Sequence, residues 1–377
     1  MKVKSRDKSK KIKVYINPGV HPQFEEITRY PPEGVEYLVD KTKGDHNNEW
    51  MRKKRILITL VQKYLQLPRI TYLKKAKDCD VIHSTRGIMP LNKKPWVTDI
   101  ESGAAFAGLE WTSLKKPLMK RLIRKYLSSK YCKKILPQSE AAKKSLLENI
   151  DCTGFEHKIE TLYLAWHTTK LKRKPSKKVR ISFIGRDFYH KGGSDLLEAF
   201  KILNKKYPGK LKLKYKGNVP ENKRINLPNV EYLENIPDPK KFYDAIFGDC
   251  DIYVQPTTID SFGVSILEAM STGLPIVCTD DFTLPELVED GHNGFLVKSP
   301  VHWYKYLRRG SKTYDKIIRK PHPETVKELV EKISILVDKP KLRKKMGRNS
   351  FKMVESGKFS IKERNKKLKR IYEEALG

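Results

Sequence analysis

Two acidic residues eight positions apart, Asp260 and Glu268, form the strongest candidate site in the sequence. An apolar run from Ile252 predicts a buried strand that ends at Pro256, and a helix is predicted to begin near Gly263. Asp260 then lies in the loop and Glu268 inside the helix, so that both carboxylates can face the same crevice. Open α/β sheets bind their ligands at the carboxyl ends of parallel strands. The spacing therefore predicts a ligand-binding crevice lined by two acids.

A second, weaker motif combines glycines with basic residues, in Gly185-Arg186 and Lys191-Gly192-Gly193. Here a strand is predicted to end in a glycine, and glycine lets the backbone approach a ligand closely. The N-terminus of the helix that follows attracts phosphate. Arg186 and Lys191 would add charge-assisted hydrogen bonds to a diphosphate. The alternative is an ordinary helix start with solvated basic side chains.

The elements that must position these residues alternate between short apolar strands and amphipathic helices, a pattern typical of parallel βαβ units. In the first half we predict strands at 12–16, 81–83, 96–100 and 135–137, and helices at 50–66, 114–132 and 140–148. In the second half we predict strands at 179–184, 211–215, 230–233, 252–255, 275–278 and 294–297, and a helix at 193–205. The basic stretch 168–178 is the best linker candidate. The sequence thus predicts two α/β domains with a cleft between them.

The second half resembles the retaining, family 4 type glycosyltransferases of the GT-B fold. The family pattern is an acid, seven residues and then Glu, and this chain has Asp260-Ser-Phe-Gly followed by Glu268-Ala-Met. Further matching segments are Gly273-Leu-Pro-Ile-Val, Leu284-Pro-Glu286-Leu-Val and Gly291-His-Asn-Gly294-Phe-Leu-Val. The resemblance is most specific from about Val179 to Val297.

This resemblance implies a GT-B fold with two facing Rossmann-like domains and a C-terminal helix that crosses back. We expect an acceptor-binding domain at 1–170, a nucleotide-sugar-binding domain at 171–357, and the returning helix at 358–377. The implied reaction moves a hexose-type sugar, with retention, from a UDP- or GDP-sugar to a hydroxyl of a glycan, lipid or other acceptor. The resemblance implies neither a metal nor another cofactor.

The resemblance also implies roles for the matching residues. Glu268 is expected to hold the ribose hydroxyls of the nucleotide, and Asp260 is expected to hold hydroxyls of the donor sugar. Arg186 and Lys191 are expected to neutralise the diphosphate as it leaves, in place of a metal. Backbone N–H groups at the helix start are expected to face the sugar and the diphosphate; they belong to Phe262, Gly263, Val264 and Ser265.

Weaker expectations concern the surroundings of the nucleotide. Gly19 would let the N-terminal domain approach the phosphates, and Gly185 belongs to the phosphate-binding turn. Asn218 and the segment Ile236-Pro237 are expected near the base. Glu286 either caps a helix near the phosphates or is a plain helix-start acid.

Two positions depart from the family pattern. Asp260 stands where the family usually has Glu, so the shorter side chain bears on which sugar or hydroxyl is held. Many members carry a His after an N-domain strand, whereas this chain reads Thr98-Asp99-Ile100-Glu101. Asp99 and Glu101 are either candidates to orient the acceptor or sugar, or loop acids with structural hydrogen bonds. The family's front-face mechanism lets the leaving phosphate take the acceptor proton, so no protein nucleophile is expected.

The formal net charge of +34 favours polyanionic partners. The segment 115–134 holds nine Lys or Arg and no acid. It is interpreted either as a helix that packs on its domain with a solvated basic face, or as one that binds an anionic membrane. The segment 301–321 mixes aromatic and basic residues, and either binds a partner or packs on its own domain.

The cysteines and the apolar segments of the sequence bear on where in the cell the protein is expected. Five cysteines without metal-ligand spacing predict buried, reduced thiols and no metal site. No secretory apolar region follows the basic N-terminus, and no apolar run approaches the roughly 18 residues that span a bilayer. We therefore expect a cytoplasmic protein that the basic surface can bring to the inner face of the membrane.

Three rival classes remain for the experiments to separate. A GT-B phosphorylase or an epimerase fits the paired acids less well than nucleotide-sugar transfer does. A non-catalytic relative would bind the donor without transferring it. A basic nucleic-acid-binding protein is permitted by the charge, but no zinc-finger, helix-turn-helix or RNA-recognition signature is present, so nucleic acid is not the expected partner.

Overall fold

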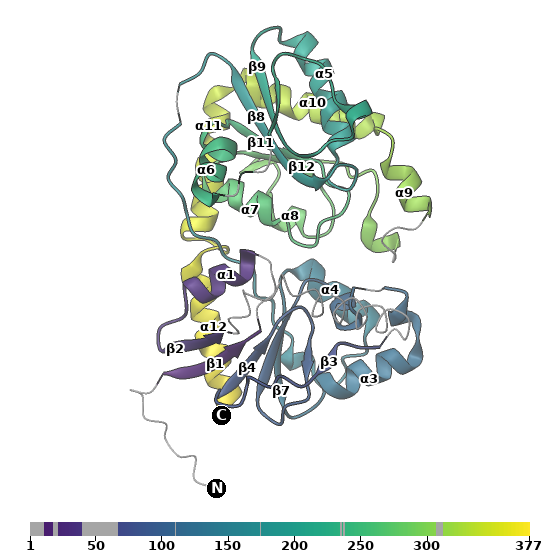
Figure 1. Cartoon of the computed structure of the whole chain (residues 1–377), viewed down its shortest axis with the longest axis vertical. Helices are drawn as coiled ribbons and strands as arrows, with labels where there is room; N and C mark the ends of the chain where they lie inside the picture. Colours follow the sequence, from purple (N-terminus) through teal and green to yellow (C-terminus); the bar gives the residue numbers. More distant parts are fainter. Residues whose placement is uncertain are drawn as a thin grey trace. The chain divides into compact units, whose positions relative to one another are not determined.

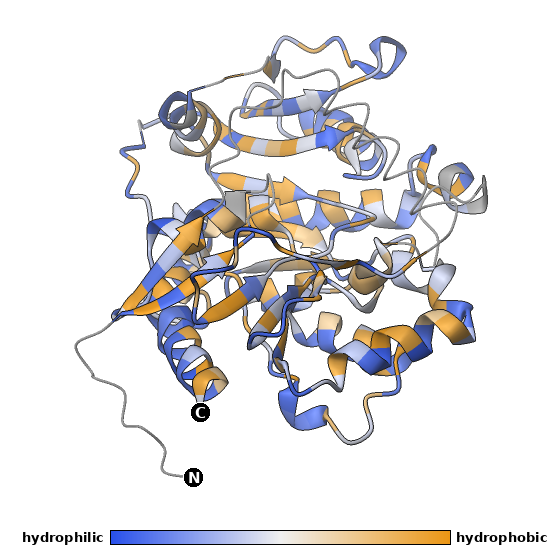
Figure 2. Cartoon of the chain, turned by 60° about the horizontal axis from the view of Figure 1, so that its bottom comes forward, coloured by the Kyte–Doolittle hydropathy of each residue, from blue (hydrophilic) through white to orange (hydrophobic). Residues whose placement is uncertain are grey.

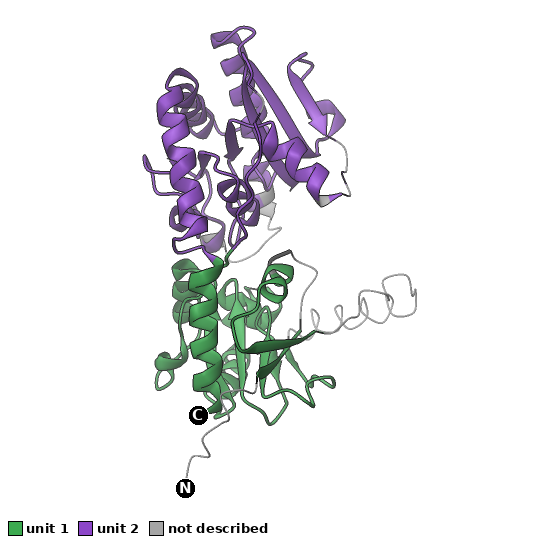
Figure 3. Cartoon of the chain, turned by 90° about the vertical axis from the view of Figure 1, so that its left-hand side faces the viewer, with its two compact units in different colours: residues 1–165, 361–377 green, residues 166–360 purple. Residues whose placement is uncertain are grey.

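The computed structural model describes residues 11–17, 22–39, 67–109, 111–173, 175–233, 236, 238–306 and 312–377. Gly19, Pro237 and the predicted helix at 50–66 lie outside these residues. The chain divides into two compact units: unit 1 is Met1–Ala165 with Ile361–Gly377, and unit 2 is Trp166–Ser360 (Figure 3). The chain thus enters unit 2 at 166, where we expected 171, and leaves it at 360, where we expected 357.

Unit 1 is built on a parallel sheet with strand order β2-β1-β4-β6-β7 (Figure 1). The strands are β1 (Ile12–Ile16), β2 (Val35–Val39), β4 (Val81–Ser84), β6 (Trp96–Ile100) and β7 (Cys132–Pro137). A separate pair joins β3 (Ile70–Thr71) to β5 (Met89–Pro90). The helices include α1 (Pro22–Arg29), α3 (Pro117–Leu127), α4 (Glu140–Asn149) and α12 (Ile361–Leu376), and the 3₁₀ turns are Gly103–Ala107, Ser113–Lys115 and Glu156–Lys158.

A capping residue explains the start of helix α4, and packing explains the position of helix α12. The Ser139 hydroxyl accepts a hydrogen bond from the Ala142 N–H at 3.0 Å, which is the N-cap expected at the start of α4. Helix α12 returns to unit 1 and packs its buried residues into the core beneath the sheet; they are Leu368, Ile371, Tyr372 and Ala375. The C-terminal residues therefore complete the first unit.

The helix predicted over 114–132 is wrong in its length. Residues Ser113–Lys115 form a separate 3₁₀ turn, and α3 begins at Pro117, whose missing N–H is harmless in the first helical turn. The helix ends at Leu127, and Cys132 already belongs to β7. Basic residues on both sides of these breaks hid the boundaries, because Lys and Arg are compatible with helix and turn alike.

Unit 2 is built on a second parallel sheet, with strand order β10-β9-β8-β11-β12-β13 (Figure 1). The strands are β8 (Val179–Asp187), β9 (Leu211–Asn218), β10 (Val230–Leu233), β11 (Ile252–Gln255), β12 (Ile276–Thr279) and β13 (Gly294–Val297). The helices are α5 (Gly193–Lys206), α6 (Pro239–Tyr243), α7 (Val264–Ser271), α8 (Leu284–Leu287), α9 (Lys312–Ile318), α10 (Pro323–Asp338) and α11 (Pro340–Glu355). A 3₁₀ turn covers Glu221–Lys223, another covers Trp303–Tyr306, and a π-helical turn covers Asp244–Gly248.

The strand order of unit 2 fixes where a ligand can bind. From β8 the chain continues to β9 on one side, whereas β11 lies on the other side of β8. The carboxyl ends of β8 and β11 therefore flank a topological switch point, where doubly wound sheets open a crevice. The hydropathy of the residues agrees with a sheet covered by helices, because the strands are mostly hydrophobic and the outer helices show a hydrophilic face (Figure 2).

The basic stretch expected to be a linker is instead held on unit 2. The Thr169 N–H donates to the Ser271 carbonyl at 3.1 Å. The Arg173 side chain donates to the carbonyls of Thr272, at 2.6 Å, and Cys250, at 3.0 Å. Because Ser271 and Thr272 end helix α7, these donors satisfy carbonyls that have no partner within the helix. This part of the chain is therefore a strap across unit 2.

Candidate active site

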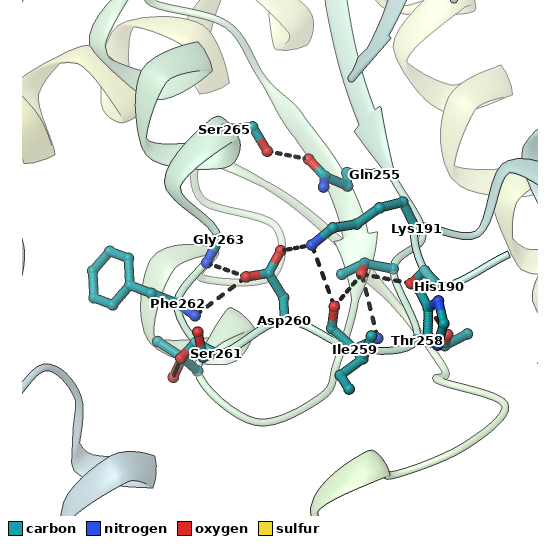
Figure 4. Close-up of polar contacts among 12 residues, drawn as sticks. His190, Lys191, Gln255, Thr258, Ile259, Asp260, Ser261, Phe262, Gly263 and Ser265 are labelled. Carbon is teal, nitrogen blue, oxygen red and sulfur yellow. Dashed lines mark hydrogen bonds and ion pairs between the residues drawn. The ribbon is translucent and has the colours of Figure 1, made fainter. Parts of the chain in front are cut away.

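The two motifs predicted from the sequence meet at the switch point of unit 2. Lys191 follows β8, and its Nζ lies 2.6 Å from Oδ2 of Asp260, which follows β11 (Figure 4). The two residues are 69 positions apart in sequence. Both side chains are mostly buried, with 26% of Lys191 and 13% of Asp260 exposed. Partial burial strengthens an ion pair relative to one at the open surface.

Glycine makes this close approach possible. Gly192 has a φ of +73°, and a Cβ at this position would stand 1.8 Å from the Pro256 carbonyl oxygen. A Cβ at Gly185 would stand 2.6 Å from the Cβ of Lys191. Both contacts are far shorter than real Cβ contacts, so only glycine lets the 185–193 turn lie directly on the end of β11.

The turn after β8 is also hydrogen-bonded to the loop after β11. The His190 carbonyl accepts from the backbone N–H groups of Thr258, at 2.9 Å, and Ile259, at 3.3 Å. The hydroxyls of Thr257 and Thr258 donate to the same carbonyl, at 3.0 and 3.2 Å. The loop that carries Asp260 is thus held to the turn that carries Lys191 by backbone contacts (Figure 4).

Asp260 also organises the start of helix α7. Its Oδ1 accepts from the N–H groups of Phe262, at 3.2 Å, and Gly263, at 2.8 Å. Negative charge is favourable at a helix N-terminus, so the arrangement stabilises the start of the helix. Phe262 and Gly263 were expected to turn their N–H groups toward a ligand; in the structure both N–H groups donate to Asp260. Val264 and Ser265 form the first turn of α7 and are half-buried.

Glu268 lies further along α7 and is half-buried. Burial raises the pKa of Tyr253 well above its ordinary value, and the charges of both Glu268 and Asp260 raise it further. Because Tyr253 belongs to β11, both carboxylates act on the same strand end. The Tyr253 hydroxyl donates to Oε1 of Gln255 at 2.6 Å, and so does the Ser265 hydroxyl at 2.6 Å.

Four other predicted residues also lie at or beside this edge of the sheet. Gly185 and Arg186 belong to the last residues of β8, and Arg186 is exposed. Asn218 ends β9, is exposed, and pairs with Asp187 across the sheet. Glu286 lies in the short helix α8 and is half-exposed.

The candidate acids of unit 1 have a different setting. Asp99 is buried, and its Oδ1 accepts from the Arg86 N–H at 2.9 Å. Its Oδ2 lies 3.6 Å from Nε2 of His83, and His83 in turn hydrogen-bonds the Tyr372 hydroxyl at 2.6 Å. Asp99 therefore makes a structural hydrogen bond through Oδ1, whereas its buried Oδ2 has no hydrogen-bond partner among the described residues. Glu101 lies 3.9 Å from the Arg86 guanidinium.

The aromatic and basic segment 301–321 packs on its own unit, as far as it is described. Tyr314 is buried, its ring stacks on His190 at 5.7 Å, and its hydroxyl donates to the Thr258 carbonyl at 3.2 Å. Trp303 packs on Phe282, with ring centroids 4.8 Å apart. The segment therefore braces the loop that leads to Asp260, a role that no local sequence motif indicates.

Helix α3 in unit 1 shows a buried and an exposed face. Met119, Ile123 and Leu127 are buried, whereas Leu118 is 69% exposed. The exposed face also carries Lys120, Arg121 and Lys125. Packing on the domain therefore accounts for the inner face, while the outer face combines an apolar side chain with several cations.

Within the described residues, no group of three or more His, Cys, Asp or Glu side chains is arranged to hold a metal ion. In the same ranges, no helix has the length and apolar character needed to cross a membrane. All five cysteines are buried and form no disulfide.

Comparison with known proteins shows what the segment that carries this site is similar to. Residues 166–309 match the family model of glycosyl transferases group 1, and this match covers both motifs of the site. The crystal structure of Anabaena HepE in complex with UDP and glucose is similar with a TM-score of 0.58 at 14% identity. The similarity covers 95% of this chain and 98% of HepE. The fold is therefore that of the GT-B glycosyltransferases, with two Rossmann-like halves.

Two relatives are similar in sequence. The capsular polysaccharide biosynthesis glycosyltransferase CapM of Staphylococcus aureus is 28% identical over 188 residues, which cover 48% of this chain and 42% of CapM. The chain thus matches CapM over less than half of that protein's length. An uncharacterized glycosyltransferase of Methanocaldococcus jannaschii is 27% identical over 299 residues, 74% of this chain and 69% of that protein.

Proposed function

We propose that this chain is a glycosyltransferase that moves a sugar from a nucleotide-sugar donor to a hydroxyl group of an acceptor. The observation that carries the proposal is the meeting of Lys191 and Asp260 at the switch point of unit 2, inside the segment that matches glycosyl transferases group 1. A cation, a carboxylate and a helix start lie together there. Such a set of groups suits a diphosphate linked to a hydroxylated sugar.

In the proposed mechanism, Lys191 and Arg186 stabilise the negative charge of the leaving diphosphate. Lys191 pairs with Asp260 through Nζ, so the diphosphate must compete with this carboxylate for Nζ. Asp260 holds hydroxyls of the sugar and Glu268 holds those of the ribose. The acceptor oxygen attacks the anomeric carbon from the face that the diphosphate leaves, and the leaving phosphate takes the acceptor proton. Configuration is retained without a metal or a protein nucleophile.

For the donor, we propose a UDP-hexose first and a GDP-sugar second. HepE was crystallised with UDP and glucose, which supports the uridine nucleotide. For the acceptor, we propose a glycan or a lipid-linked glycan, in line with the polysaccharide pathway of CapM.

We also propose that unit 1 meets its acceptor at an anionic membrane surface on the cytoplasmic side. The support is the outer face of α3, where exposed Leu118 lies among Lys120, Arg121 and Lys125. The test is flotation with vesicles of phosphatidylglycerol or of phosphatidylcholine. The expected result is binding to the anionic vesicles that Arg121→Glu weakens. Equal binding to both vesicles at moderate salt would contradict this part.

The central test is a thermal-shift screen against UDP-, GDP- and ADP-sugars, because a ligand that binds the native state raises its melting temperature. The expected result is stabilisation by one donor that Glu268→Ala abolishes. Glu331→Ala, which truncates an exposed glutamate of α10, is the control and should leave the shift intact. Stabilisation without sugar transfer would indicate a non-catalytic relative. Binding of DNA without binding of any donor would refute the proposal.

A further inference from the structure

A chain of hydrogen-bonded side chains ends on Glu268. The indole Nε1 of Trp166 lies 2.8 Å from the hydroxyl oxygen of Tyr243, and this hydroxyl lies 3.2 Å from Oε1 of Glu268. The three residues are far apart in sequence, with 77 positions between the first pair and 25 between the second. Trp166 is only 3% exposed, whereas Tyr243 and Glu268 are half-buried.

The chemistry of the three groups fixes the direction of these bonds. An indole N–H can only donate, so the Tyr243 oxygen accepts from Trp166. The hydroxyl has a single hydrogen, and it donates this hydrogen to the carboxylate. A hydrogen bond to an ionised acceptor is stronger than one between neutral groups, so the Tyr243 hydroxyl is well suited to hold Oε1 of the Glu268 carboxylate in place. The ionised carboxylate accepts hydrogen bonds only, as needed to hold the hydroxyl hydrogens of a ribose.

Tyr243 is itself held in place by its surroundings. Its ring contacts Phe247 edge-to-face at 5.2 Å and lies 6.3 Å from the ring of His167. The His167 ring stacks in turn on Trp166 at 6.0 Å. Tyr243 is the last residue of α6, and the π-helical turn Asp244–Gly248 follows directly. Single π turns occur often at functional sites, because the extra residue re-aims the neighbouring side chains.

Trp166 is fixed through its backbone as well. It is the first residue of unit 2, and its N–H donates at 3.2 Å to the carbonyl of Phe359, the second-last residue of unit 2. The Phe359 ring contacts Phe262 edge-to-face at 6.5 Å, next to Asp260. The points where the chain enters and leaves unit 2 are therefore bonded to each other, and each contacts an aromatic residue that neighbours one of the proposed donor-binding acids.

We propose that Tyr243 and Trp166 are positioning residues that hold the Glu268 carboxylate in the orientation that accepts the ribose hydroxyls of the nucleotide. This inference rests on the proposed function, in which Glu268 binds the ribose. Trp166 directs the hydroxyl of Tyr243, and Tyr243 directs Oε1 of Glu268. Neither aromatic residue needs to touch the nucleotide for this role.

The experiment compares ribonucleotides with analogues that lack the ribose hydroxyls. Binding of UDP and GDP, and of their 2′,3′-dideoxy forms, is measured by titration calorimetry on the wild type and on Tyr243→Phe. The variant keeps the ring and removes the hydroxyl. We expect ribonucleotide affinity to fall about tenfold, in line with loss of one hydrogen bond to a charged group. Affinity for the dideoxy analogue should change less than about twofold, because its ribose offers Glu268 nothing to hold.

A second variant tests the direction of the chain. Trp166→Phe keeps an aromatic ring and removes the Nε1 donor, and should weaken ribonucleotide binding by about threefold. Combined with Tyr243→Phe it should add no further loss, because Trp166 acts through the missing hydroxyl. The matched control is Tyr207→Phe, which removes a tyrosine-to-carboxylate bond of 2.7 Å to Asp338 elsewhere in unit 2. This control should bind every nucleotide like the wild type.

The possible outcomes separate this inference from the proposed function. A wild type that binds no nucleotide overturns both. If the wild type binds and Tyr243→Phe binds equally well, the inference alone is overturned. It is also overturned if Tyr243→Phe loses affinity equally for ribose and dideoxy forms, because a purely structural role would do so. The positioning role is supported if Tyr243→Phe loses affinity only for the ribonucleotide. It also requires that adding Trp166→Phe in the double variant causes no further loss of affinity.

Discussion

Gly192 offers the sharpest test of how the two motifs are brought together. In Gly192→Ala, the new Cβ would stand 1.8 Å from the Pro256 carbonyl oxygen, and the residue would also keep a φ of +73°. The left-handed conformation costs an alanine about 1–2 kcal/mol. The collision with fixed backbone adds about 1–3 kcal/mol, the usual range for overpacking a tight site. We therefore expect the free energy of unfolding to fall by about 2–5 kcal/mol.

A matched glycine separates the two contributions. Gly209 has the same φ of +73° in the same unit, but a Cβ there would meet nothing within 4 Å. Gly209→Ala should therefore cost only the backbone term of about 1–2 kcal/mol. Urea unfolding of both variants measures the difference, and donor binding should weaken only in Gly192→Ala, where the turn that carries Lys191 must move. If the two variants lose equal stability, the close contact with the Pro256 carbonyl is not what requires glycine at position 192.

Three further predictions concern single side chains. Asp260→Asn removes the charge that pairs with its lysine, so sugar transfer should fall at least about tenfold, and the free energy of unfolding should fall by about 1–3 kcal/mol because the partly buried Lys191 loses its charged partner. Tyr314→Phe loses the hydroxyl contact with Thr258 and should lower the free energy of unfolding by about 1 kcal/mol in urea. For His322, burial lowers the pKa, but hydrogen bonding and the charge of Asp195 outweigh it and raise the pKa above 6.5. Its stabilisation is therefore full below about pH 6.5 and is lost as pH rises through the folded-state pKa, so the difference in free energy of unfolding between wild type and His322→Gln should narrow as pH rises above about 6.5.

Each of these predictions has a result that would contradict it. An unchanged rate of sugar transfer in Asp260→Asn would show that the Asp260 carboxylate has no role in the reaction. Tyr72→Phe changes a side chain that is 52% exposed and should leave the free energy of unfolding unchanged. An equal loss of stability in both tyrosine variants would argue that the contact of Tyr314 with the loop before Asp260 does not stabilise the unit. A stability gap that widens with pH would show that the His322 pKa is lowered in the folded chain.

Local sequence patterns predicted a large part of the fold. The strands β1, β6, β10, β11 and β13 begin and end at the residues that the apolar pattern predicted. Strand β2 was missed, because only Val35 of its five residues is fully buried and its alternation is weak. Helix α3 was drawn too long, because its ends depend on Pro117 and on the following strand more than on composition.

The candidate site was predicted in its residue types but not in its contacts. The sequence alone indicated Asp260, Glu268, Arg186 and Lys191, because acids, cations and glycines cluster at predicted strand ends. It did not indicate that Asp260 would hold Lys191 as well as the first N–H groups of α7. It also left open whether the segment 301–321 packs on its own domain, where Tyr314 now contacts the loop before Asp260.

Elements could be predicted and contacts could not, because a local sequence pattern reports burial within one element and not which elements meet. Periodicity reports which face of an element is buried, and this depends on neighbours within a few residues. The pairings of Lys191 with Asp260 and of Tyr243 with Glu268 depend instead on strand order and on the turns that bring separate elements together. The sequence by itself therefore determined the α/β class, most strands and the chemistry available at the strand ends. Only the tertiary structure decided which of these groups touch, because contacts across 69 positions follow from the topology of the sheet.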